Sequence, residues 1–138
     1  MTYDLGRSME RRIIDPWTWQ EEYGFHQGHE VTDPTRTLYL SGQTSLDADG
    51  NPVHMGDMAG QIRQVIDNIE AVLAEAGMTL ADIVRINIFT TDMDLFRAHA
   101  GELERLREAG SQYASTLVGV TRLAFPEFLV EIEATAAR

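Results

Sequence analysis

The chain contains no cysteine among its 138 residues. Disulfide bonds, zinc sites with thiolate ligands and a cysteine nucleophile are therefore excluded. No apolar run reaches the roughly 18–20 residues that a membrane helix requires. Residues 1–12 are polar and charged, without the apolar core of a signal peptide. These absences predict a soluble, cytoplasmic protein without a membrane partner.

Basic residues are scarce. The 11 lysine and arginine residues face 22 aspartates and glutamates, which gives a net charge of −11. A field of that sign repels phosphate backbones, and the basic residues are scattered along the chain, so the composition disfavours a nucleic-acid partner. The length and the 43% hydrophobic content suit one domain with a core of its own.

Hydrophobic periodicity predicts two helices between three groups of strands. The first helix starts near Asp57, a favourable N-cap, and ends at Gly77, while the second covers residues 94–109. The predicted strands cover residues 11–14, 25–31, 37–42, 83–90, 116–123 and 128–135. This order predicts an α+β fold, a mixed sheet with two helices on one face. Because no third helix is predicted to cover the other face, we expect subunits to associate there.

Several short motifs occur in a fixed order. The main ones are Ser41-Gly42-Gln43, Gly56-Asp57, and the segments 82–85, 118–123 and 130–134. Over residues 25–136 this pattern resembles the reactive-intermediate-deaminase family, called Rid or YjgF. The resemblance implies one domain, 1–138, with an N-terminal extension at residues 1–24 and a family core of chorismate-mutase-like fold at 25–136. It also implies a homotrimer with a small-molecule cleft between adjacent subunits and no metal or organic cofactor.

The same resemblance suggests the site residues. Glu131 matches the glutamate that activates water in the family, and is the catalytic candidate. The ligand-binding candidates are Phe25, Ser41, Gly42, Gln43, Ser115, Thr116 and Leu117. Ser115 stands where active members carry an arginine that binds the substrate carboxylate. The loss of this arginine removes a charge-assisted bond to the carboxylate worth about 1.5–3 kcal/mol. The standard arginine-dependent deamination of 2-iminopropanoate is therefore not expected.

Two functions stay open. One is a divergent hydrolase or deaminase of imines or enamines, in which Glu131 directs water. The other is a non-catalytic, metabolite-binding or regulatory module that uses the same cleft. A ribonuclease activity, which is sometimes attached to the family, is disfavoured by the charge of −11.

The N-terminal segment leaves two further questions open. The aromatic stretch that contains Trp17, Trp19, Tyr23 and Phe25 either lines a pocket or packs against the core or a neighbouring subunit. The nearby His26 and His29 could take part in acid–base chemistry near neutral pH, but a structural role is the favoured interpretation.

Overall fold

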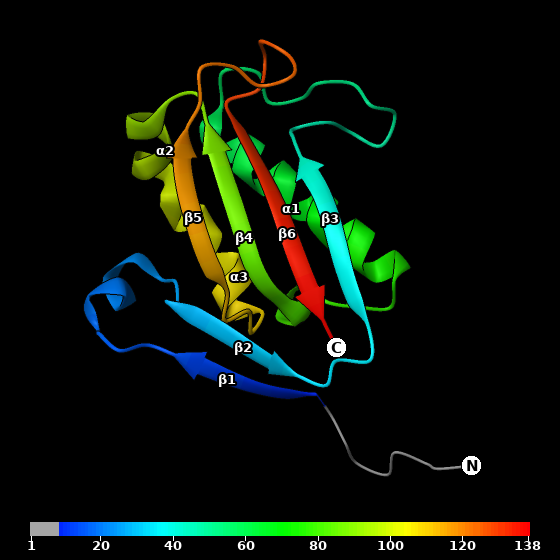
Figure 1. Cartoon of the computed structure of the whole chain (residues 1–138). Coiled ribbons are helices and arrows are strands. Elements are labelled where there is room, and N and C mark those ends of the chain that lie inside the picture. Colours follow the sequence, from blue (N-terminus) through cyan, green and yellow to red (C-terminus); the bar gives the residue numbers. More distant parts are fainter. Residues whose placement is uncertain (1–8) are drawn as a thin grey trace.

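The main sheet has four strands in the order β3-β6-β4-β5 (Figure 1). They are β3 (Thr37–Gln43), β6 (Val130–Ala137), β4 (Ile83–Thr90) and β5 (Ala114–Gly119). The pair β4–β5 is parallel and the other pairs are antiparallel, so the predicted mixed sheet is confirmed. This computed structural model describes residues 9–138, and the first eight residues of the predicted extension lie outside it.

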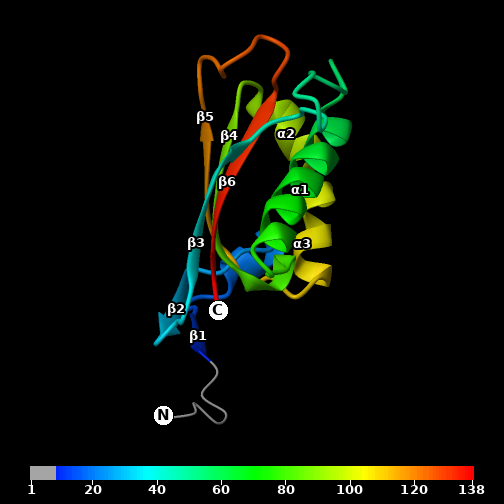
Figure 2. The ribbon, with the colours of Figure 1, turned by 90° about the vertical axis from the view of Figure 1, so that its right-hand side faces the viewer.

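Helix α1 (Met58–Glu75) crosses one face of the sheet, as predicted (Figure 2). Its N-cap, Asp57, accepts a hydrogen bond from the Gly60 N–H at 2.9 Å. Gly77 follows the helix with a φ of 72°, which glycine adopts without steric cost. The caps and the apolar stripe therefore define this helix well from sequence.

The prediction of one helix over residues 94–109 is wrong. The chain forms α2 (Met93–His99), a 3-10 turn at Ala100–Leu103 and α3 (Glu104–Glu108), so three α-helices cover the sheet. Gly101 lies in the 3-10 turn, and glycine is a poor helix former because it gives up more backbone freedom than other residues. The inward-facing Phe96 and Leu106 are still buried, so the apolar spacing predicted their burial but not the break.

The strand predictions also need correction. The segments 116–123 and 128–135 become β5 and β6, and β5 ends at Gly119. Gly119 pairs with Thr90, the last residue of β4. Because β5 is an edge strand that pairs with β4 alone among the strands of residues 9–138, it cannot continue once β4 ends.

The first two strands form a separate sheet, so they do not extend the main one. β1 (Glu10–Ile14) pairs antiparallel with β2 (Gly28–Thr32). β2 begins three residues later than predicted, because the preceding 3-10 helix Trp19–Tyr23 and the left-handed Gly24 turn the chain first. Figure 1 shows this small sheet at the end of the main sheet where the chain terminates.

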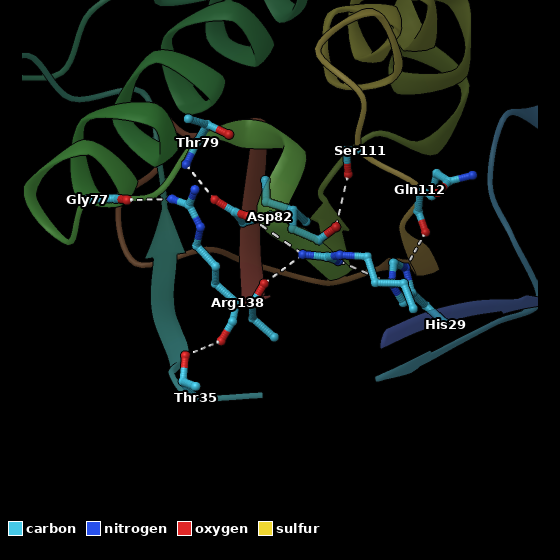
Figure 3. A network of polar contacts seen from close by, with 11 residues as sticks. His29, Thr35, Gly77, Thr79, Asp82, Ser111, Gln112 and Arg138 are labelled. Atoms are coloured by element: carbon cyan, nitrogen blue, oxygen red, sulfur yellow. Dashed lines mark hydrogen bonds and ion pairs between the residues drawn. The ribbon is translucent and has the colours of Figure 1, made fainter. Parts of the chain in front are cut away.

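A polar network ties the small sheet to the main one (Figure 3). Arg11 donates a hydrogen bond of 2.7 Å to the Ala137 carbonyl and lies 3.6 Å from the Asp82 carboxylate. One ring nitrogen of His29 lies 3.2 Å from Arg11, and the other lies 2.7 Å from the Gln112 carbonyl. Burial is the main cause that lowers the pKa of His29, which favours the neutral ring. His29 thus has a structural role.

Side chains alternate strictly between the two faces of β6. Val130, Ile132 and Ala134 are buried under the helices together with Ile86 and Ile88 of β4. The intervening Glu131 and Glu133 lie on the opposite face, as the sequence predicts. Figure 2 shows all three helices on one side of the sheet and none of them on the other. We call this second side the outer face.

Gln61 of α1 fixes the connection that leads into β6. Its side chain is buried, and its amide donates to the carbonyls of His54 and Glu127 at 3.2 and 2.9 Å. Its side-chain oxygen accepts from the Leu129 N–H at 2.8 Å. Three backbone groups of two loops are satisfied in this way, and Glu131 follows only two residues after Leu129.

We expect Gln61→Met to lower the free energy of unfolding by about 1–3 kcal/mol, because the buried backbone groups lose their partner while the side-chain volume is kept. Urea denaturation at a fixed protein concentration measures this change. Gln64→Met is the matched control on the same helix, since Gln64 is half-buried and, in the part of the chain that the structure describes, its side chain bonds only that of Asn68. An equal loss in both variants would contradict the role given to Gln61.

Candidate functional site

A pocket of about 630 Å³ lies between β5, α2 and the segment 22–25. Three of the predicted ligand-binding residues, Phe25, Ser115 and Leu117, line it together. Other lining residues include Glu22, Tyr23, Ile88, Met93, Phe96, Arg97, Ala100, Arg107 and Tyr113. Most of the wall is apolar, and the polar groups are few, as in small-molecule sites.

The register of β5 produces this pocket. Ser115 pairs with Ile86 and Leu117 pairs with Ile88, so both side chains point toward the helices. The intervening Thr116 points to the outer face, where its hydroxyl accepts a hydrogen bond of 2.7 Å from Arg85. Ser115 and Thr116 therefore lie on opposite faces of the sheet within one chain, because neighbouring strand residues face opposite ways, and the binding role of Thr116 stays a prediction.

The N-terminal segment reaches the pocket through a short bridge to β5. The His26 N–H donates to the Tyr113 carbonyl at 3.0 Å, which brings Phe25 against the pocket wall. The ring of Trp19 packs edge-on against Phe25 with a centroid distance of 5.9 Å. The aromatic residues of this stretch thus differ in their positions. Tyr23 and Phe25 line the pocket, whereas Trp17 is not among its lining residues and is exposed.

His26 does not line this pocket. Its Nδ1 lies 2.7 Å from the carboxylate of Asp15, which also accepts the Gln27 N–H at 2.7 Å. The hydrogen bond from the Gln27 N–H is the largest cause that lowers the pKa of Asp15, and the bond with His26 is the second. The pair fixes the turn after β1, which is consistent with a structural role for His26.

Two arginines border the pocket in different ways. Arg107 forms an ion pair with Glu104 and contacts the Gly24 carbonyl at 3.4 Å and the Tyr113 hydroxyl at 3.5 Å. Arg97 is exposed, and among residues 9–138 it makes neither an ion pair nor a side-chain hydrogen bond. No sequence motif marks either residue, and their proximity depends on where the second helical segment breaks.

Glu131 lies on the outer face, next to Gly42. A Cβ atom at Gly42 would lie 2.5 Å from Glu131 Oε2, so the absence of a side chain there leaves room for the carboxylate. Burial, and then the negative charge of Glu133, raise the pKa of Glu131 above its ordinary value. Glu133 itself accepts a hydrogen bond of 2.9 Å from Asn87.

The predicted residues therefore fall into two groups within one chain. Phe25, Ser115 and Leu117 form the pocket group on the helix side of the sheet. Glu131 and Gly42 form the outer-face group, with the exposed Ser41 beside them in β3. Gly42 and Gln43 also line a smaller cavity of about 330 Å³ that reaches α1. The binding and catalytic roles of all these residues remain predictions.

Within residues 9–138, no group of three or more histidines, aspartates and glutamates is placed to hold a metal ion. None of the helices in this range is both long and apolar enough to cross a membrane.

Comparison with known proteins gives a consistent family match. The family described as Endoribonuclease L-PSP matches residues 25–138. A RutC family protein of Pyrococcus horikoshii is 35% identical over 99 residues, which cover 72% of this chain and 77% of that protein. Protein DfrA of Myxococcus xanthus is 30% identical over 107 residues, covering 78% and 76% of the two chains.

Solved structures match over most of the chain. The crystal structure of YyfB from Yersinia pestis, described as a protein of unknown function of the conserved Rid protein family, gives a TM-score of 0.84 at 35% identity, covering 93% of this chain and 98% of that one. The YjgF gene product of E. coli gives a TM-score of 0.68 at 31% identity, covering 83% and 87%. The fold is therefore shared with these proteins.

We expect Glu133→Gln to lower the pKa of Glu131, because the substitution removes the neighbouring negative charge while glutamine can still accept the bond from Asn87. The pKa should stay above its ordinary value, since burial remains the larger cause. An NMR titration of the side-chain carboxyl of Glu131 measures the shift. Glu108→Gln, an exposed change on α3, should leave it unaltered. An unchanged pKa in Glu133→Gln would contradict the electrostatic coupling.

Proposed function

Because the chain belongs to the Endoribonuclease L-PSP family, also known as YjgF/Rid, we propose that it is a homotrimer that binds a small metabolite between subunits and hydrolyses an imine or enamine. The observation that carries this proposal is the division of the predicted site into two groups on opposite sides of the sheet. Glu131 of one copy can meet the pocket of another only across an interface. The family core is residues 25–136, and residues 1–24 are an extension, of which Glu22 and Tyr23 line the pocket.

The outer face has the character of a contact surface. Its side chains include Tyr39, which is 79% exposed, and Val118, which is 38% exposed. Polar pairs lie beside them, such as Arg85 with Thr116 and Asn87 with Glu133. The pocket lies along the edge strand β5, where a neighbouring copy can reach it. An interface at this face would cover the side of the sheet that the helices leave open.

The pocket suits a small molecule and not RNA. Its volume of about 630 Å³ is in the usual range for small ligands. The net charge of −11 opposes binding of a polyanion, so cleavage of RNA is not proposed despite the family description.

Glu131 supplies the chemistry of the proposed reaction. Its raised pKa, caused first by burial and then by the charge of Glu133, makes the carboxylate a better proton acceptor than an ordinary glutamate. It accepts a proton from water as the water oxygen bonds to the imine carbon. Glu131 returns this proton to the nitrogen, which gives a carbinolamine. The carbinolamine hydroxyl then gives its proton to the nitrogen through Glu131 as the C–N bond breaks, so that the carbonyl forms and ammonia leaves. An enamine enters the same route after protonation at carbon.

A second function, metabolite binding without turnover, is favoured by one observation. The pocket of a single chain contains Ser115, whose hydroxyl can bond a ligand, but it does not contain Glu131. Ligand binding therefore does not require the carboxylate that hydrolysis requires.

We expect sedimentation velocity to give a species of three times the chain mass of 15.5 kDa. Val118→Asp should shift the distribution toward smaller species, because it places a charge on the outer face. Val72→Asp is the matched control, since Val72 is 37% exposed on α1, against 38% for Val118. A monomeric wild type, or equal behaviour of the two variants, would contradict the proposed interface.

We expect the protein to accelerate ammonia release from imines generated by amino-acid or amine oxidases, and Glu131→Gln to lose at least about a hundredfold of that rate. Glu108→Gln should keep the wild-type rate. A full rate in Glu131→Gln would exclude the assigned role of Glu131. No acceleration by the wild type, with ligand binding retained, would favour the binding module.

A further inference from the structure

We infer that Arg97 is the anion-binding residue of the pocket and that the pocket takes a small monoanion with an apolar body. The inference rests on the proposed function only in that the pocket must bind a small molecule. It adds the chemical class of that molecule and the residue that selects it.

The pocket has two cations, and one of them is already engaged. The chain has no lysine, so arginines are its permanent side-chain cations. Arg107 pairs with Glu104, and its guanidinium lies against the backbone of Gly24 and near the Tyr113 hydroxyl. These contacts join α3 to the turn after Tyr23, and they occupy the guanidinium with protein groups.

Arg97 differs from the other arginines of the helix layer. Arg63 pairs with Glu102 at 2.9 Å, and Arg105 pairs with Asp67 at 2.6 Å and Glu70 at 3.2 Å. Acidic residues outnumber arginines two to one, 22 against 11, so partners are plentiful in this chain. Within residues 9–138 Arg97 nevertheless forms no ion pair, and it lines the pocket. Its guanidinium is therefore available to a carboxylate or a similar planar anion.

The rest of the wall sets the remaining properties of the ligand. Phe25, Met93, Phe96 and Leu117 offer apolar surface to the body of the ligand. Glu22 lines the same pocket, and its carboxylate would repel a second negative charge. A monoanion paired with Arg97 meets less of that repulsion than a dianion does, whereas an uncharged analogue gains nothing from the guanidinium.

Three probes of matched shape test this inference on the full-length protein by isothermal titration calorimetry. They are phenylacetate, the uncharged phenylacetamide and the dianion phenylmalonate. We expect the wild type to bind phenylacetate at least about tenfold more tightly than either analogue. Arg97→Gln should reduce the preference for phenylacetate over phenylacetamide to near unity, and Arg97→Lys should restore part of it.

Arg12→Gln is the control, because it makes the same charge change at an exposed residue of β1 that does not line the pocket. It should bind all three probes as the wild type does. The inference is overturned if Arg97→Gln keeps the full preference for phenylacetate, if Arg12→Gln loses as much of it, or if the wild type shows no preference or no binding.

The outcome is separable from that of the hydrolysis experiment. Loss of anion preference in Arg97→Gln, without ammonia release by the wild type, would support the role of Arg97 and reject hydrolysis. Ammonia release with an unchanged ratio of rates for carboxylate-bearing and uncharged imines in Arg97→Gln would support hydrolysis and reject the role of Arg97.

Discussion

Side chains along β4 and β6 alternate between the two faces of the sheet, and this alternation determines which residues lie in the core and which lie on the outer face. One set, which includes Ile86, Ile88, Val130 and Ile132, is fully or almost fully buried under the helices. The buried face fixes the register of both strands, because a shift of one residue would place Glu131 and Glu133 of β6, or Arg85 and Asn87 of β4, in the core. Burial of the apolar set therefore also fixes Glu131 and Glu133 on the outer face, although those two residues contribute nothing to the core.

The same alternation continues into the edge strand and divides the site. Ser115 and Leu117 are paired in register with buried residues of β4 and therefore face α2. Thr116 and Val118 are paired with residues of the outer face and point to that side. A catalytic arrangement that needs both Ser115 and Glu131 cannot form through any side-chain movement in one chain, since a sheet separates them. The oligomer is thus a requirement of the proposed chemistry, independent of any effect on stability.

The parts of the fold that the sequence predicts well are those specified by neighbours along the chain. α1 has an N-cap, an apolar stripe and a terminal glycine, and β4 is rich in strand-forming apolar residues that alternate with Arg85 and Asn87, so the sequence predicts both to within a few residues. The end of β5 depends on where its partner β4 stops, and the separate small sheet depends on contacts such as Arg11 with Ala137, 126 residues apart. Resemblance placed Phe25, Ser115 and Leu117 in one pocket, but Arg97 had no motif to mark it.

The position of the free guanidinium changes how a ligand would lie in the pocket. Ser115 belongs to the sheet wall and Arg97 to the α2 wall. An anion held at α2 directs its apolar body toward Phe25 and Leu117, and leaves the Ser115 hydroxyl to bond a neutral polar group. The anion is then bound at α2, away from the sheet. The end of the ligand near β5, the strand that would lie closest to a neighbouring copy in the proposed trimer, is its uncharged end. A carboxylate such as Glu131 approaching from that copy would meet a neutral carbon–nitrogen bond instead of another anion, which removes the electrostatic penalty that two negative groups at the same end would impose.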